Sequence, residues 1–177
     1  QLWLLLDNSI AFNGDVHAKI TARTAAGYLA YERWYENGVH ALAYVMGEPE
    51  HWQEAAGDGF GDQLQLTTAA MQQGPLAPGE ALRLRLDWTG TNAPAGELTT
   101  FVHLVGADGA TVAQVDSPLA NAGWMTSPSG PTAEQRLAVI LPDNAAPGTY
   151  TLVVGVYNSS SGKRLACTAG GDSLTLG

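Results

Sequence analysis

Hydrophobic and polar residues alternate along much of the chain, in short segments that are separated by turn-forming residues. The alternation is clearest at Leu82, Leu84, Leu86 and Trp88, because charged residues separate them and a threonine follows Trp88. Successive side chains of a strand point to opposite faces, so this pattern predicts strands that bury one face. We expect such strands at about residues 63–69, 80–88, 98–106, 110–116, 134–141, 149–157, 163–167 and 172–176.

Turn-forming residues join the predicted strands, and no helical pattern lies between them. Asp108-Gly109 predicts a tight hairpin, residues 159–162 predict another, and Pro78-Gly79 and Pro147-Gly148 each precede a strand. Short strands with closely spaced turns are typical of an antiparallel β-sandwich of immunoglobulin-like or jelly-roll type. We therefore predict a mainly β fold, with such a sandwich over residues 62–177.

The first part of the chain follows a different pattern. The apolar run at residues 2–6 fits a buried strand, and Asp15 is a suitable N-cap for the helix that follows. Residues 28–35 and 39–46 flank Asn37-Gly38, which is a strong signal for a hairpin turn. This order predicts a small α/β unit, with the succession β-α-β-β, in front of the sandwich.

The segment between the two patterns is acidic, rich in glycine and without periodicity, from residue 47 to residue 61. We expect a connecting loop here, so that residues 1–61 comprise the α/β unit with its loop and residues 62–177 form the sandwich domain. Asp58 and Asp62 are close enough in the loop to suit a calcium ion. The segment lacks the dense Asp/Asn alternation of calcium-binding loops, so the prediction favours a linker without a metal.

Composition limits the classes of function. With 177 residues, of which 45% are hydrophobic and 14% charged, the chain is long and apolar enough to bury a core. Its net charge of −9 and its scattered basic residues argue against binding to nucleic acid or to an anionic membrane. Cys167 is the only cysteine, which excludes an internal disulfide and a cysteine-based zinc site.

The first residues of the chain also lead to expectations about a membrane span, a signal peptide and a longer polypeptide. The apolar run at residues 2–6 is too short to span a bilayer, so the chain itself has no predicted membrane span. The run also lacks the basic leader and the cleavage site of a signal peptide. An abrupt start on a strand suggests a piece of a longer polypeptide.

No arrangement of residues in the sequence predicts catalysis. The four histidines have no metal-ligand spacing, and the serines lie in segments that use serine for turns. No Gly-x-Ser-x-Gly motif is present, and sequence spacing places no two carboxylates in one cleft. We therefore predict no catalytic residues, no metal site and no cofactor.

Three residues are candidates for contacts with a ligand: Trp52, Trp124 and His103. The two tryptophans lie outside the predicted strands, Trp52 in the acidic loop and Trp124 in a long loop at residues 117–133. Sugar-binding sandwiches use exposed tryptophan and tyrosine rings as platforms on which sugar rings stack. The alternative for both tryptophans is that they pack over an end of the sandwich. His103 shares a strand face with apolar residues. The alternative to a ligand contact is therefore that His103 lies in the core or at an interface.

Several motifs of the β-rich part occur together. They are Pro78-Gly79-Glu80, Leu82-x-Leu84-x-Leu86-x-Trp88, Phe101-Val102-His103-Leu104, Asp108-Gly109, Ala113-Gln114-x-Asp116, Leu141-Pro142, Pro147-Gly148-Thr149-Tyr150, Gly155-Val156-Tyr157 and Gly162-x-Arg164-Leu165. This combination resembles the C-terminal soluble domain of bacterial multi-spanning glycosyltransferases, which are similar to the dolichyl-phosphate-mannose–protein mannosyltransferase class and use a lipid-linked sugar donor. Leu2-Trp3-Leu4-Leu5-Leu6, with the helix and hairpin after it, resembles the segment that directly follows the last membrane helix of these proteins.

The segment around Trp124 departs from the family pattern. Members commonly have Pro-Thr before this tryptophan and Gly-Glu after it, whereas this chain has Ala122-Gly123 before it and Met125-Thr126 after it. The acidic catalytic residues of such transferases lie in loops of the membrane portion. The resemblance therefore implies nothing catalytic for this chain.

The resemblance implies a non-catalytic accessory domain on the extracytoplasmic face of a bacterial membrane, as part of a longer membrane protein. Its expected partners are a glycan or an acceptor, which it would bind or position, and the membrane-embedded transferase portion of the same polypeptide. A purely structural or protein-interaction sandwich domain and a secreted carbohydrate-binding module are the alternatives. An independent hydrolase is a third, and it would require a cleft with two carboxylates or a nucleophile–base pair.

Overall fold

The structure is a computed structural model that describes residues 1–7, 14–36, 38–93 and 97–176. These residues contain thirteen strands, one α-helix and one short 3-10 helix, η1. In chain order they are β1 (Leu2–Asp7), α1 (Gly14–Thr24), β2 (Tyr28–Trp34), β3 (Val39–Val45), β4 (Trp52–Ala56), β5 (Gly59–Phe60), β6 (Leu64–Gln72), β7 (Ala81–Gly90), β8 (Leu98–Val105), β9 (Thr111–Pro118), η1 (Leu119–Asn121), β10 (Met125–Ser127), β11 (Gly130–Ile140), β12 (Thr151–Asn158) and β13 (Leu174–Leu176). The prediction of a mainly β protein is confirmed.

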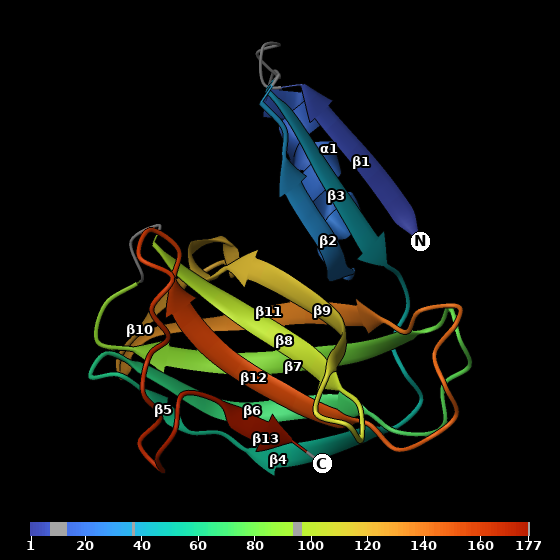
Figure 1. The fold of residues 1–177 in the computed structure, drawn as a ribbon. Coiled ribbons are helices and arrows are strands. Elements are labelled where there is room, and N and C mark those ends of the chain that lie inside the picture. The colour runs from blue at the N-terminus through green and yellow to red at the C-terminus, as the bar shows by residue number, and fades with distance from the viewer. Residues whose placement is uncertain (8–13, 37, 94–96, 177) are drawn as a thin grey trace.

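The strands form two sheets, which lie one in front of the other in Figure 1. The larger sheet has nine strands in the order β1-β3-β2-β11-β7-β6-β4, with β10 paired to β11 and β5 paired to β6. The smaller sheet has four strands in the order β13-β12-β8-β9, and all its pairings are antiparallel. The larger sheet is mixed, because β2 pairs with β11 in parallel.

Side chains from both sheets share one core. On β7, Leu84, Leu86 and Trp88 are at most 1% exposed, whereas the residues between them lie half-buried on the opposite face. The smaller sheet contributes residues such as Val102 and Val154, which are fully buried in the same cluster. Burial of one such side chain stabilises a fold by about 1.5–3 kcal/mol. The alternation that predicts the strands therefore also supplies the core.

Residues 1–46 form what we call the N-terminal segment, and residues 52–176 form the two-sheet body. The N-terminal segment contains β1, α1, β2 and β3 and projects from the body in Figure 1. The two parts share backbone pairing, since Leu29 of β2 lies opposite Leu137 of β11. They also share a core, since Leu29 and Leu42 belong to the same buried cluster as the body.

The turns of the structure support the hairpin predictions at Asp108-Gly109 and at residues 159–162, where the N–H of Asn158 donates to the carbonyl of Lys163 at 2.8 Å, and they agree with the predicted turn position at Gly38. Gly106 and Ala110 are joined by a backbone hydrogen bond of 2.9 Å, and Gly109 has a φ of 80°. Glycine adopts this left-handed conformation without the steric cost of a side chain. Gly38 also has a φ of 80°, in the turn between β2 and β3, whereas Asn37 lies outside the described residues.

Three other predictions differ from the structure. Residues 47–61, expected as a loop, contain β4 and β5, which pair with β6 at the edge of the larger sheet. Residues 163–167, expected as a strand, make only the isolated bridges Tyr157–Arg164 and Phe60–Cys167. Because these bridges reach different sheets, the segment cannot continue along either one. The helix begins at Gly14, so Asp15 lies within it and not at the predicted N-cap position.

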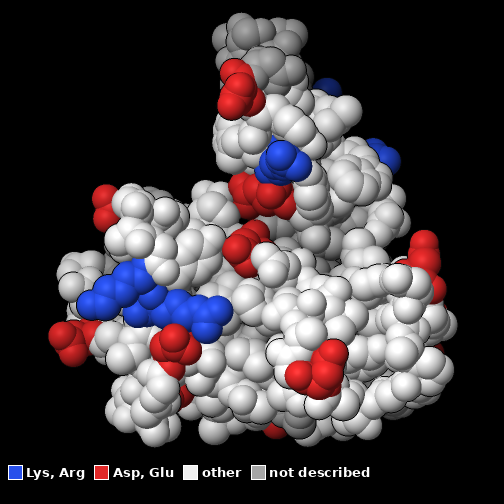
Figure 2. All heavy atoms as spheres, in the orientation of Figure 1, with Lys and Arg blue, Asp and Glu red and all other residues white. Residues whose placement is uncertain are grey.

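Few residues of the chain are charged, 14% of the total. Figure 2 shows that uncharged residues cover most of the face drawn there, with acidic and basic side chains in small separate groups. The helices among the described residues include none that is long and apolar enough to cross a membrane.

A substitution of Gly155 tests the packing of β12 against β8. An added Cβ at Gly155 would lie 2.3 Å from Cζ of Phe101, which is only 2% exposed and has little room to move. We expect Gly155→Ala to lower the free energy of unfolding by about 1–3 kcal/mol, measured by urea denaturation. Gly148→Ala is the matched control, because a Cβ there has no neighbour within 4 Å. Equal stability of the two variants would contradict the described packing.

Candidate functional site

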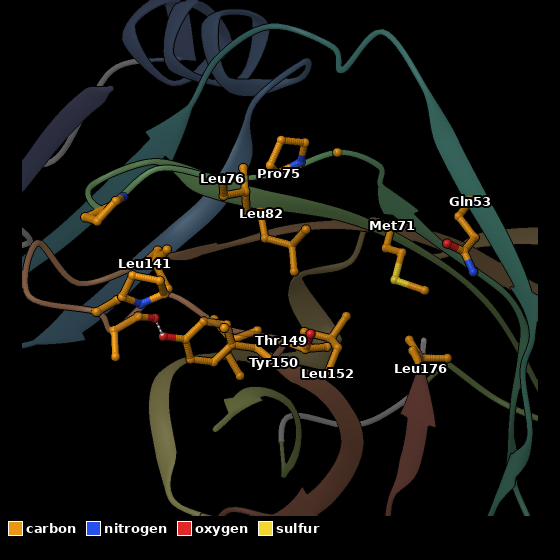
Figure 3. A pocket seen from close by; sticks show the side chains of 17 residues that line it. Gln53, Met71, Pro75, Leu76, Leu82, Leu141, Thr149, Tyr150, Leu152 and Leu176 are labelled. Atoms are coloured by element: carbon orange, nitrogen blue, oxygen red, sulfur yellow. Dashed lines mark hydrogen bonds between the residues drawn. The ribbon is translucent and has the colours of Figure 1, made fainter. Parts of the chain in front are cut away.

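An apolar pocket of about 540 Å³ opens between the two sheets at one end of the two-sheet body. The larger sheet contributes Met71 from β6 and Leu82 from β7 to its lining. The smaller sheet contributes Leu152 from β12 and Leu176 from β13. Figure 3 shows these four side chains around one common space.

Hydrogen bonds between two loops hold the rim of this pocket. The backbone N–H of Gly79 donates to the carbonyl of Leu141, and the N–H of Leu141 donates to the carbonyl of Glu80, both at 2.8 Å. Within the second loop, the hydroxyl of Tyr150 donates to the carbonyl of Ala146, the contact drawn as a dashed line in Figure 3. These bonds fix the loops relative to each other, so the pocket is formed before any ligand enters it.

The lining of the pocket suits an apolar ligand. Leu104, Leu152 and Leu176 are at most 5% exposed and form buried parts of the lining. Among the described residues that line the pocket, none is charged, and the polar side chains are those of Gln53, Thr149 and Tyr150. Ligand pockets of this size are usually apolar with a few polar groups that orient the ligand. The pocket can therefore bind a hydrocarbon chain or ring, but it offers no acid–base pair for proton transfer.

This pocket is not predicted from the sequence. Pro78, Pro147 and Gly148, expected only as turn residues that precede strands, all line it. The signal in the sequence is that each of the two Pro-Gly turns is followed by a strand with several leucine or valine residues. The sequence alone does not show that the two turns meet, because Gly148 follows Pro78 by 70 positions, roughly two-fifths of the length of the chain.

Trp52, the first predicted contact residue, begins β4 and lies half-buried on the larger sheet. Its ring centroid is 6.1 Å from that of Tyr28, and the guanidinium of Arg85 lies 5.7 Å from the centre of the Trp52 ring. It packs beside the small buried cluster that includes Val45 and Ala138. These contacts cover part of the ring, while a contact of Trp52 with a ligand stays a prediction.

Trp124 lies between η1 and β10, and it is also half-buried. Its indole N–H donates to the carbonyl of Leu119 at 2.8 Å, and its side chain packs against the main core. The predicted loop at residues 117–133 contains η1, β10 and the first part of β11. Trp124 therefore holds this segment against the body, while a contact with a ligand stays a prediction.

His103 lies on β8, on the face of the smaller sheet that points away from the core. Its ring centroid is 4.8 Å from that of Phe101, which is also covered by the guanidinium of Arg164 at 4.4 Å. On the neighbouring strand β9, Asp116 accepts a hydrogen bond of 3.1 Å from the hydroxyl of Tyr157. Burial and the nearby Arg164 lower the pKa of His103, and the carboxylate of Asp116 opposes this shift.

The structure does not bring the three predicted residues together. Trp52 belongs to the edge of the larger sheet, Trp124 to the segment after η1, and His103 to the outer face of the smaller sheet. None of them lines the apolar pocket. Their role as ligand contacts stays a prediction.

Asp58 of the acidic segment, which the sequence offered as a calcium ligand, makes hydrogen bonds within the fold. Asp58 accepts hydrogen bonds from the N–H groups of Gly59 at 2.8 Å and Ala169 at 3.1 Å, which joins β5 to the turn before β13. Within the described ranges, no group of three or more His, Cys, Asp or Glu residues is arranged to hold a metal ion.

Comparison of the chain with protein-family models and with curated proteins gives no match. A proposal for its function therefore has to follow from its own residues and their geometry.

A pH series tests the environment of His103. Because the pKa of His103 is lowered in the folded chain, the unfolded chain binds this proton at a higher pH than the folded chain does. Its contribution is neutral above the unfolded pKa of about 6.5 and becomes destabilising as the pH falls below that value. We expect His103→Gln to gain stability relative to the wild type between about pH 7 and pH 5, measured by urea denaturation at each pH. A constant difference between the two proteins across this range would contradict the shift.

Proposed function

We propose that this chain is a non-catalytic accessory domain that binds the apolar part of a ligand in the pocket between its two sheets. The observation that carries the proposal is the uncharged lining of a preformed pocket of about 540 Å³. Binding a hydrocarbon group there removes apolar surface from water without separating any charge from its solvent. The ligand class that fits best is a lipid-linked glycan, held by its lipid.

The family resemblance supports the same proposal. Leu82, Leu141 and the turn Pro147-Gly148-Thr149-Tyr150 are among the motifs that carry the resemblance, and they line the pocket. The proteins that the chain resembles use a lipid-linked sugar donor. We infer that the chain is an antiparallel β-sandwich preceded by a small α/β unit, and that it is the extracytoplasmic part of a membrane glycosyltransferase-like protein.

A pocket variant with a matched control tests the proposal. Leu76 lines the pocket and is half-buried, so Leu76→Gln places an amide in the apolar lining without emptying the core. We expect the wild type to bind the neutral fluorescent probe N-phenyl-1-naphthylamine and to release it when farnesol is added. Leu76→Gln should weaken probe binding roughly tenfold, which corresponds to about 1.4 kcal/mol.

Leu98→Gln provides the control for this variant. Leu98 is also half-buried against the core, but it begins β8 and does not line the pocket. Its substitution should lower stability to a similar extent and leave probe binding unchanged. A wild type that does not bind the probe, or a Leu76→Gln variant that binds it as the wild type does, would exclude the apolar pocket as the site.

A second candidate function, docking against the membrane-embedded portion of the same polypeptide, is favoured by an exposed sheet face. Trp3 and Leu5 of β1 are 56% and 73% exposed. Trp3 and Tyr31 both lie opposite Ala43 of β3, and their ring centroids are 5.7 Å apart. Trp3 and Leu5 are thus largely exposed beside the half-buried Tyr31, whereas α1 lies against the face of the sheet that carries Leu42 and Tyr44. Aromatic residues such as Trp3 and Tyr31 are enriched at protein interfaces.

Hydrogen exchange tests the docking candidate. In the longer polypeptide, we expect slower exchange of the β1 amides than in the isolated chain, because a docked partner limits opening of this edge strand. Exchange in β12, at the middle of the smaller sheet, serves as the internal control and should not change. Equal exchange of β1 in both proteins would contradict docking at this face.

A further inference from the structure

A second pocket of about 460 Å³ lies where the N-terminal segment meets the two-sheet body, and we call it the junction pocket. Glu32, His40 and Tyr44 line it from β2 and β3, and Gln135 lines it from β11. Residues at the end of α1 and around η1 complete the wall. Unlike the apolar pocket, the junction pocket therefore combines polar side chains from both parts of the chain.

Gln135 is the most informative residue of the junction pocket. It is only 4% exposed, and neither its Nε2 nor its Oε1 has a hydrogen-bond partner among the described residues. It lies on the inner face of β11, where the alternating neighbours Ala133 and Leu137 are buried apolar residues. A buried amide without partners destabilises a fold, so an amide at this position is unfavourable unless a ligand uses it.

Glu32 is held in place on the opposite wall. Its Oε1 pairs with Nε2 of His40 at 3.0 Å, and the two side chains are 7% and 11% exposed. The ring of His40 in turn stacks on Trp34, with centroids 3.8 Å apart and planes within 9°. The carboxylate is therefore fixed in its orientation. On the face drawn in Figure 2, acidic side chains are visible where the N-terminal segment meets the body.

These groups match the chemistry of a neutral sugar. An amide both donates and accepts hydrogen bonds, as do the hydroxyl groups of a sugar, and the Glu32 carboxylate adds a fixed acceptor. Tyr44 supplies an aromatic ring, which suits the apolar face of a pyranose. Burial and the charge of Glu32 raise the pKa of Tyr44, so its hydroxyl keeps its proton. Of the other charged residues in the lining, Glu134 and Arg136 pair with each other at 2.7 Å, so the Glu32 carboxylate leaves an acidic balance that disfavours a negatively charged sugar.

We propose that the junction pocket binds a neutral monosaccharide unit through Gln135, Glu32 and Tyr44. This inference rests on the proposed function, because it assigns the sugar of a glycan ligand to a second pocket. The two can be tested separately, since a free methyl glycoside has no lipid chain and the naphthylamine probe has no sugar.

Titration of the isotope-labelled chain with methyl glycosides tests the inference. The probes are methyl α-mannoside, methyl β-glucoside and methyl β-galactoside, and the signal is the side-chain NH₂ pair of Gln135 in ¹H–¹⁵N spectra. We expect at least one glycoside to shift this signal in a saturable way. The same glycoside should raise the midpoint of thermal unfolding of the wild type.

Gln135→Leu and Thr100→Val separate recognition from packing. Both replace a buried polar side chain that has unpartnered atoms, but Thr100 does not line the junction pocket. Gln135→Leu should fold at least as stably as the wild type and bind the glycoside about tenfold more weakly, whereas Thr100→Val should bind it unchanged. Both variants should keep their affinity for the naphthylamine probe, so loss of sugar binding does not depend on the apolar pocket.

Two results would overturn the inference. One is the failure of all three glycosides to shift the Gln135 signal of the wild type. The other is a Gln135→Leu variant that is more stable and binds the glycoside as the wild type does, because Gln135 would then be only an unpaired core residue.

Discussion

The parallel pairing of β2 with β11 is the constraint on which the rest of the arrangement depends. It consists of one Cα pair, Leu29 with Leu137, while β11 pairs with β7 along its length from Thr132 to Ile140. A contact this short cannot hold the N-terminal segment by backbone hydrogen bonds alone. The side chain of Leu137 is fully buried and belongs to the same cluster as Leu29, so apolar burial supplies the remaining attachment. The position of β2 beside β11 is also what encloses the junction pocket.

Charged groups hold the same junction from the outer side of the larger sheet. Glu48 accepts hydrogen bonds from the hydroxyl of Tyr28 and from the guanidinium of Arg136. Tyr28 is fully buried, and burial together with the Glu48 carboxylate raises its pKa. Glu48 itself is exposed, so its ion pair with Arg136 is partly screened by solvent. The main effect of Glu48 is to connect three parts of the chain, because its contacts join β2, β11 and the segment between β3 and β4.

The sequence predicts well where burial alternates regularly, and it fails where the position of a residue depends on distant partners. Leu84, Leu86 and Trp88 follow the pattern because a central strand has a neighbour on each side and one face in the core. The pattern is weak for β4, which is an edge strand with mostly exposed residues. The hydrogen bond of Trp124 to Leu119 depends on η1, which no periodicity indicates. Nor does the sequence of β11 show that its one inward glutamine faces a pocket.

The two pockets lie at two interruptions of the strand pattern, one where the strands end and one where a polar residue takes an inward position, and both follow from how the core is filled. Large apolar side chains of β7 and β8 fill the space between the sheets along their paired lengths. Beyond these lengths, proline and glycine at residues 74–79 and 147–148 turn the chain but provide no bulk to fill the gap. At the junction, the alternation of β11 continues, but a polar side chain takes the place of an apolar one at Gln135. An apolar opening and a polar opening thus arise from two different interruptions of one pattern, which is why they suit ligands of different chemistry.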